Sequence, residues 1–278
     1  MLRRKGTNLL GGRAVEVRMH PFLASELGTA FDLNSALRTG MVPTVVSSPT
    51  SFEQVRAYAF TYIQEEVQQE RLTRNVASFN RFLEAISFSQ GSVLNLNNVA
   101  EECEVPRSSV VNYLGILEDL LLAFTLPVFR NKAKRRLASH PKFYFFDAGV
   151  YRAFRPTGPL NKPEEIDGIA LESLVIQHLR AWCDHTTAPH KLYYWRTADQ
   201  VEVDAVVYGE QGLWAFEVKN SDTVRSADAT GLRSFARDYP IAKCVVIYRG
   251  QQRLVRDGIH WIPAEQFFGD LVPNVPPA

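Results

Sequence analysis

The stretch VEVDAVVYGEQGLWAFEVK, residues 201–219, contains two segments in which apolar residues alternate with others, one on each side of a turn. The alternation over 201–208 and 213–219 predicts two β-strands. Between them, the sequence GEQG at 209–212 is typical of a hairpin turn. We therefore expect an antiparallel hairpin here, around which the rest of a sheet can be built.

The register of this hairpin places two carboxylates face to face. If Tyr208 pairs with Leu213, Asp204 lies directly opposite Glu217. Like charges directly opposite each other in an antiparallel pair are destabilising, so this pair needs a compensating cation. Carboxylate oxygens are hard ligands that suit Mg²⁺ or Mn²⁺. We interpret the pair as a metal site for assisted phosphodiester cleavage. In the same register Lys219 faces Glu202.

Composition limits the functional classes. The chain has 278 residues, of which 46% are hydrophobic and 22% charged, as in ordinary globular proteins. A net charge of +1 excludes a globally basic nucleic-acid binder, so any such surface must be local.

The cysteines and the apolar runs indicate the compartment. Cys103, Cys183 and Cys244 are far apart and lack CxxC spacing, which favours reduced thiols over a zinc or disulfide framework. No apolar run approaches the roughly 20 residues that span a bilayer. We therefore expect a cytoplasmic protein without a membrane partner.

Residues 1–71 resemble an incomplete domain. They contain one expected strand at Ala14–Met19 and helical segments at Leu23–Leu27, Leu33–Arg38 and Ser51–Arg71. One short strand offers little sheet against which these helices could be buried. A small helical lid and a truncated domain both remain open.

Residues 72–150 have the pattern of a winged helix-turn-helix. Expected helices cover 75–88, 98–103 and 107–122, and expected wing strands cover 122–129 and 142–147. We expect Asn97 to cap the second helix. The apolar positions expected to face inward on the third helix are Val110, Val111, Leu114, Leu117 and Leu121.

Two parts of this unit could contact DNA. The start of the third helix, where a recognition helix meets base edges, carries Arg107, Ser108, Ser109, Asn112 and Tyr113. The connection between the wing strands, RNKAKRRLASH, contains no acidic residue. Its basic residues are Arg130, Lys132, Lys134, Arg135 and Arg136. Such a run could hold phosphates and make binding salt-dependent. The alternative is a solvated wing tip on a domain used for protein contacts, because the helix start is rich in serine.

Residues 151–278 contain the hairpin. An amphipathic helix is expected at Ile166–Trp182, with its buried stripe at Ala170, Leu171, Leu174, Val175, Ile176 and Leu179. Further expected elements are a strand at 192–197, a helix near Ala227–Tyr239, a strand at 244–248 and a closing segment at 258–268. With the hairpin, the order is αβββαβ, an α/β arrangement with a mixed sheet.

The αβββαβ order with Glu172, Asp204 and the triplet Glu217-Val218-Lys219 resembles the PD-(D/E)XK nuclease superfamily. The whole chain is similar to the back half of prokaryotic AAA-type ATPases that carry a C-terminal nuclease-like domain of unknown function. The stretches that carry this resemblance are GRAVEVRMHPFLASELG (12–28), ALRTGMVP (36–43), YAFTYIQEEV (58–67), VVNYLGILEDLLL (110–122), PKFYFFDAGVYRAF (141–154) and YYWRTADQVEVDAVV (193–207).

The chain departs from that family in lacking a GxxxxGK[ST] phosphate loop. The segment FYFFD at 143–147 fits a wing strand better than a Walker B aspartate. The resemblance therefore implies that 1–71 is a remnant of the ATPase core and its helical lid. We expect no ATP binding or hydrolysis by this chain. Truncation and a genuine short form are both compatible with the sequence.

The resemblance also implies roles for individual residues. Asp204 and Glu217 would hold a divalent cation, with the Val218 carbonyl as a further ligand. Lys219 would orient the attacking water or stabilise the phosphorus centre, and Glu172 would be an outer carboxylate.

Two functions follow as hypotheses. The first is a DNA-binding protein with a metal-dependent nuclease-like domain, derived from an AAA-type ATPase. The second is a non-catalytic DNA- or protein-binding module, in which the carboxylates only form salt bridges with Lys219 and Arg196. DNA, an ATPase or a second copy of the chain are the expected partners.

Overall fold

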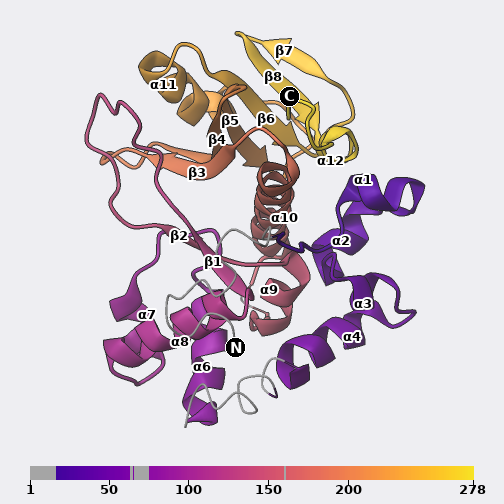
Figure 1. Cartoon of the computed structure of the whole chain (residues 1–278), viewed down its shortest axis with the longest axis vertical. Helices are drawn as coiled ribbons and strands as arrows, with labels where there is room; N and C mark the ends of the chain where they lie inside the picture. The colour runs from indigo at the N-terminus through magenta and orange to yellow at the C-terminus, as the bar shows by residue number, and fades with distance from the viewer. Residues whose placement is uncertain (1–16, 63–64, 66–74, 160) are drawn as a thin grey trace, which may run out of the picture.

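The computed structural model describes residues 17–62, 65, 75–159 and 161–278 and has a mixed α/β architecture (Figure 1). Its centre is a six-stranded mixed sheet in the order β3-β4-β5-β6-β8-β7. The strands are β3 (His190–Arg196), β4 (Glu202–Gly209), β5 (Gly212–Lys219), β6 (Lys243–Tyr248), β7 (Leu254–Arg256) and β8 (Ile259–Pro263). The pairs β5–β6 and β6–β8 are parallel and the other pairs antiparallel, so the α/β arrangement expected from the sequence is present.

The hairpin has the predicted register, with Tyr208 opposite Leu213. Its ladder ends at Ala205–Phe216, one position before Asp204 and Glu217. On the other side of β4, the register with β3 shifts by one residue between Tyr193 and Trp195. Two residues of β4, Asp204 and Ala205, therefore lie opposite Tyr194 alone. This is a β-bulge, a feature that redirects side chains.

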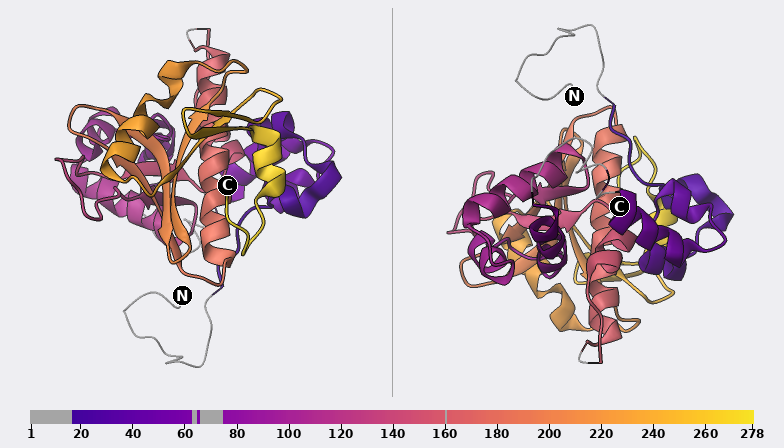
Figure 2. Two further views of the ribbon diagram at one scale, coloured as in Figure 1. Left: turned by 90° about the horizontal axis from the view of Figure 1, so that it is seen from above. Right: turned by 90° about the horizontal axis from the view of Figure 1, so that it is seen from below.

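Helices cover both faces of the sheet. On one face lies α10 (Pro163–His185), which contacts β3, β4 and β5, together with α12 (Ala264–Asp270). On the other face lies α11 (Thr230–Asp238), which follows the short 3-10 helix η3 (Ser226–Ala229). The helix expected at Ile166–Trp182 is thus present and longer, and its whole predicted stripe is buried. Figure 2 shows α10 passing through the middle of the molecule.

The helices expected within 72–150 form α6 (Val76–Ser87), α7 (Leu96–Glu102) and α8 (Arg107–Asp119). The expectation that Asn97 caps α7 was wrong. The side chain of Asn95 accepts hydrogen bonds from the backbone N–H groups of Asn97 and Asn98, so the helix begins at Leu96.

Three side chains of α8 and its end are placed differently from the prediction. Val111 and Leu121 are each 46% exposed rather than buried. The helix ends at Asp119, and Leu121 has a positive φ of 61°, which turns it out of the apolar stripe. Tyr113, expected at the DNA-facing start, is instead buried against Phe79 and Phe82, because an aromatic ring at that position completes the core between α6 and α8.

The two strands that follow are short and antiparallel: β1 (Ala123–Leu126) and β2 (Lys142–Phe145). We call residues 127–141 between them the basic connection. It is attached to the edge of the six-stranded sheet, because Val128 forms a bridge with Tyr194 and Leu137 forms a bridge with Thr197. Phe129 anchors this attachment, since its side chain is buried in the core under α11.

The helix α9 (Ala148–Phe154) begins where β2 ends. Asp147 caps it by accepting from the N–H groups of Gly149 and Val150, and its other oxygen accepts from Met41 N–H at 2.7 Å. A side chain at Gly40, whose φ is +77°, would collide with this carboxylate. Asp147 therefore joins the N-terminal helices to the rest of the core.

The N-terminal segment is helical. It contains α1 (Ala24–Leu27), a 3-10 turn (Gly28–Ala30), α2 (Leu33–Thr39), α3 (Pro43–Val46) and α4 (Ser51–Ala57), which continues as a π-helix over Tyr58–Tyr62. Of the strand expected at Ala14–Met19, residues 14–16 lie outside the described part and 17–19 are not in a strand. Most of the expected helix beyond residue 62 also lies outside the described residues. One apolar core runs from Ala24 to Leu271.

Within the described ranges, every helix is too short or too polar to cross a lipid bilayer.

Candidate functional site

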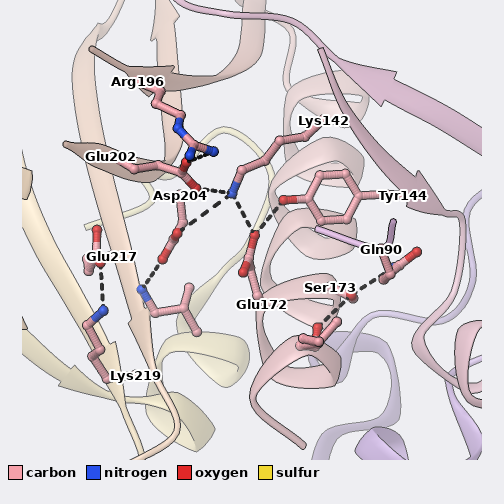
Figure 3. Close-up of polar contacts among 12 residues, drawn as sticks. Gln90, Lys142, Tyr144, Glu172, Ser173, Arg196, Glu202, Asp204, Glu217 and Lys219 are labelled. Atoms are coloured by element: carbon pink, nitrogen blue, oxygen red, sulfur yellow. Dashed lines mark hydrogen bonds and ion pairs between the residues drawn. The ribbon is translucent and has the colours of Figure 1, made fainter. Parts of the chain in front are cut away.

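Four carboxylates gather where α10 meets the start of β4 and the end of β5: Glu172, Glu202, Asp204 and Glu217 (Figure 3). We call them the acid cluster. Asp204 lies in the β-bulge, where its Oδ2 accepts a hydrogen bond from Val218 N–H at 2.8 Å. The β4–β5 ladder runs only as far as Ala205 and Phe216, and beyond that pair the aspartate side chain accepts the backbone N–H of β5.

Glu217 and Lys219 lie beside Asp204 on β5. The ammonium of Lys219 donates to Glu217 Oε1 at 2.7 Å. Glu217 is only 9% exposed, and its buried Oε2 has no hydrogen-bond partner within the described part of the chain. The expected contact between Lys219 and Glu202 is replaced by this one, because Glu202 is held by Lys142 and by Arg196.

Lys142, the first residue of β2, is the side chain that the sequence did not reveal. Its ammonium lies 2.5 Å from Glu202 Oε1, 3.1 Å from Glu172 Oε1 and 3.9 Å from Asp204 Oδ1. The side chain is only 2% exposed. Figure 3 shows it reaching into the acid cluster from outside the six-stranded sheet.

Two more residues outside the hairpin hold the acid cluster in place. Tyr144 donates its hydroxyl to Glu172 Oε1 at 2.6 Å, and Arg196 Nη1 lies 3.1 Å from Glu202 Oε2. Lys142 and Tyr144 alternate with phenylalanines, so they share one face of β2. This alternation of polar residues within an apolar strand was the signal available in the sequence, but nothing in it pointed to α10.

A further contact fixes α10 against β2. Gln90 donates to Ser173 Oγ at 2.8 Å, while its own Oε1 accepts from Phe145 N–H at 2.8 Å. Ser173 directly follows Glu172 on α10. The glutamine therefore sets the distance between the helix that carries Glu172 and the strand that carries Lys142.

Burial and crowding shift the ionisation of the acid cluster. Burial raises the pKa of Asp204 well above its usual range, and repulsion from Glu217 and Glu172 adds to this effect. Burial also raises the pKa of Glu217 to about 7, although Lys219 opposes the shift. For Lys142, burial lowers the pKa, but the surrounding carboxylates, Glu172 first, outweigh it and raise the pKa well above normal.

A divalent cation such as Mg²⁺ or Mn²⁺ needs several oxygen ligands that are not already engaged. Within the described residues, no group of three or more His, Cys, Asp or Glu side chains is arranged to hold a metal ion. Glu172 and Glu202 are occupied by Lys142, which leaves Asp204 and Glu217. Among the described residues, Glu217 Oε2 is a buried hard oxygen without a hydrogen-bond donor, so Glu217, with Asp204 near it, is where a cation could be held.

The residues predicted to contact DNA lie outside the acid cluster. On α8, Arg107, Ser108 and Asn112 are exposed and Ser109 is partly buried. In the basic connection Arg130, Lys132, Lys134, Arg135 and Arg136 are all exposed. Arg135 is not free for phosphate, because it forms a 2.6 Å ion pair with Asp238 of α11. Arg130 donates to the carbonyl of Ala138 at 2.7 Å.

The basic connection nevertheless lies next to the acid cluster. Ala138 N–H donates to the carbonyl of Arg196, and Ala198 N–H donates to the carbonyl of Arg136. Since Arg196 binds Glu202, the basic residues lie one strand away from the carboxylates. The sequence predicted the two features separately, and the structure places them side by side.

Comparison with known proteins gives two matches to families. Residues 167–267 match a domain of unknown function, DUF4143, which covers the whole acid cluster but not Lys142. Residues 30–161 match a second domain of unknown function, DUF8612.

Two mycobacterial proteins are similar to most of the chain. They are the uncharacterized proteins Mb2031c of Mycobacterium bovis and Rv2008c of Mycobacterium tuberculosis, each 26% identical over 264 residues, or 92% of this chain. The match covers 58% of each relative, so the chain spans little more than half their length. The crystal structure of protein VC1899 from Vibrio cholerae matches 81% of this chain and 55% of its own, with 15% identity and a TM-score of 0.30.

Proposed function

We propose that this chain binds DNA and that the acid cluster is a Mg²⁺- or Mn²⁺-dependent site for phosphodiester cleavage. The observation that carries the proposal is the arrangement of Asp204, Glu217 and Lys219. Two carboxylates with raised pKa values lie together, one of their oxygens is buried without a partner, and a lysine lies beside them. Perturbed carboxylates of this kind gather at functional sites more often than elsewhere.

Each residue has a role in this proposal. Asp204, Glu217 and the Val218 carbonyl would hold the cation, which when bound lowers the pKa of a water molecule and neutralises charge on the phosphate. Lys219, whose side chain is 31% exposed, can turn from Glu217 towards a phosphate and stabilise negative charge there. Glu172 keeps Lys142 in place and acts on the site through it.

The DNA would reach this site over the basic connection. Lys132, Lys134 and Arg136 are exposed, and among the described residues none of them forms an ion pair with a carboxylate. The carbonyl of Arg136 accepts a hydrogen bond from Ala198 N–H, just beyond the strand that carries Arg196. Phosphate contacts here would position a duplex beside the acid cluster. The order of α6, α7, α8, β1 and β2 is compatible with a winged helix, and the exposed start of α8 would then supply further contacts.

Metal binding is tested by thermal unfolding. Millimolar Mn²⁺ should raise the melting temperature of the wild type, because a ligand that binds only the folded state stabilises it. Asp204→Asn should abolish the shift. The matched control is Asp270→Asn, an exposed carboxylate paired with Arg253, which should keep it. An equal shift in all three proteins would contradict the metal site.

Cleavage is tested separately with supercoiled and linear DNA. Lys219→Met should retain the Mn²⁺-dependent shift and lose cleavage by roughly 100-fold or more, because the lysine acts on the transition state rather than on the cation. Asp204→Asn should lose both. If the wild type binds Mn²⁺ but cuts neither substrate, with or without an added ATPase partner, the nuclease proposal fails.

A second candidate function is a non-catalytic binding module, and Lys142 is the observation that favours it. The chain supplies its own cation to three of the carboxylates, so the acid cluster can exist without a metal. In that case Mn²⁺ would leave the melting temperature unchanged, while DNA or protein binding through the exposed surfaces would remain.

A further inference from the structure

The ammonium of Lys142 has the surroundings of a bound cation. Three carboxylates contact it: Glu172 from α10 and Glu202 and Asp204 from β4, at 3.1, 2.5 and 3.9 Å. It is almost completely shielded from solvent, with 2% of the side chain exposed. Metal sites that cleave phosphodiesters often contain two cations about 3.5–4 Å apart that share a carboxylate.

We infer that the ammonium of Lys142 takes the place of a second metal ion, so that the site binds one divalent cation per chain. This inference rests on the proposed metal site at Asp204 and Glu217. Asp204 is the shared carboxylate: its Oδ1 faces Lys142, and its Oδ2 accepts from the backbone N–H of Val218, the residue after Glu217. Lys142 is a positioning residue, since it contacts the carboxylates rather than the substrate.

The hydrogen bonds separate the two cation positions. Glu172 Oε1 already accepts from Tyr144 and Lys142, and the two oxygens of Glu202 are held by Lys142 and Arg196. These oxygens are satisfied without a metal ion. By contrast, Glu217 Oε2 is buried and finds no partner among the residues that the structure describes. Only the Glu217 side of the acid cluster therefore needs a further cation.

The charges lead to the same number of metal ions. The four carboxylates of the acid cluster face three cations, Lys142, Arg196 and Lys219, which leaves one negative charge when every group is ionised. One divalent ion together with one phosphodiester makes this assembly neutral. Two divalent ions would leave it strongly positive in a buried site, where an excess of like charge is costly.

The test counts Mn²⁺ ions by isothermal titration calorimetry on the full chain. The wild type should bind one Mn²⁺. Methionine is similar in length to lysine but carries no charge. The Lys142→Met variant therefore removes the ammonium from three carboxylates and should bind two Mn²⁺ ions. Lys142→Arg is the matched control that keeps the cation, and it should bind one. Adding Glu202→Gln to Lys142→Met should return the number of bound Mn²⁺ ions to one, because the cation position vacated by the ammonium loses a carboxylate ligand.

Thermal unfolding gives a second readout. Without metal, Lys142→Met should melt well below the wild type, because three partly buried carboxylates lose their counter-ion. Millimolar Mn²⁺ should raise its melting temperature by more than that of the wild type, since two ions stabilise it. A Lys142→Met chain that stays unfolded at millimolar Mn²⁺, as judged by circular dichroism, would overturn the inference, because a divalent ion would then not replace the ammonium.

The outcomes separate this inference from the proposed function. One ion in both the wild type and Lys142→Met overturns the role of Lys142 and leaves the metal site intact. Two ions in the wild type also overturn it. No ion in the wild type and one in Lys142→Met supports the role of Lys142 but removes the metal site at Asp204 and Glu217. No ion in either protein overturns both.

Discussion

His178 is a buried titratable group that lies away from the acid cluster. It is 1% exposed, its Nε2 accepts from Ala24 N–H at 3.1 Å, and its Nδ1 donates to the carbonyl of Leu174 at 2.9 Å. These two bonds require the neutral ring, and burial against Phe268 lowers the pKa of His178 to about 4. The histidine thus joins α1 to α10 only while it is uncharged.

This lowered pKa predicts a loss of stability in acid. Between pH 6.5 and pH 4 the unfolded chain binds a proton at His178 that the folded chain does not, so the free energy of unfolding falls as pH falls. At roughly 1.4 kcal/mol per pKa unit the full effect is about 3 kcal/mol. The measurement is urea unfolding of the wild type and His178→Gln at pH 8 and pH 5.

The comparison with the variant is necessary because the ionisation of Asp147 changes the stability with pH in the opposite direction. Burial raises the pKa of Asp147 to about 6, so the folded chain binds its proton first and gains stability as pH falls through this value. We expect His178→Gln to be less stable than the wild type at pH 8 and to lose much of that deficit at pH 5. A deficit of the same size at both pH values would show that His178 does not titrate as described.

At the scale of elements, local patterns predicted most of the fold. The hairpin register was correct from Tyr208–Leu213 to Ala205–Phe216, because alternation and turn length determine it. The β-bulge at Asp204 was not predictable, since it depends on pairing with β3. The predicted position of the α7 cap was wrong by two residues. Asparagine is a favourable cap residue at both 95 and 97, and only the backbone direction distinguishes the two positions.

The close packing of α11 on β4 gives a prediction at this scale. A Cβ atom at Gly231, in the first turn of α11, would collide with the backbone oxygen of Glu202. Gly231→Ala should therefore displace α11 or β4 and lower the free energy of unfolding by about 1–3 kcal/mol, despite the better helix propensity of alanine.

The control for this variant is Gly115→Ala, in the middle of α8. A Cβ atom there meets nothing within 4 Å, so the substitution should stabilise the chain by up to about 1 kcal/mol. Denaturant unfolding of both variants measures the two effects. If Gly231→Ala is as stable as Gly115→Ala, α11 is not packed as closely on β4 as the structure indicates.

At the scale of the whole molecule, the acid cluster combines residues that the sequence analysis assigned to separate parts. Glu172, Asp204 and Glu217 could be predicted because they lie in the αβββαβ segment. Lys142 could not, because it is 30 residues before Glu172 and was interpreted as part of a wing strand. The basic connection brings the two parts together, since it leaves β1, runs along β3 and returns to β2.

The exposed cations of the basic connection make DNA binding there measurable. If Lys132, Lys134 and Arg136 contact phosphates, duplex affinity should fall steeply with salt, with a slope of roughly −0.9 per contact in a plot of log affinity against log salt. Changing all three to glutamine should make this slope shallower by about 2 to 3. Arg135→Gln is the contrasting variant. Loss of the ion pair with Asp238 should lower its stability, while the salt slope should stay nearly unchanged, because Arg135 is not free to contact phosphate. Fluorescence anisotropy with a labelled duplex between 50 and 200 mM salt measures each slope. If the triple variant has the slope of the wild type, DNA does not follow the basic connection, and the exposed start of α8 becomes the surface to test.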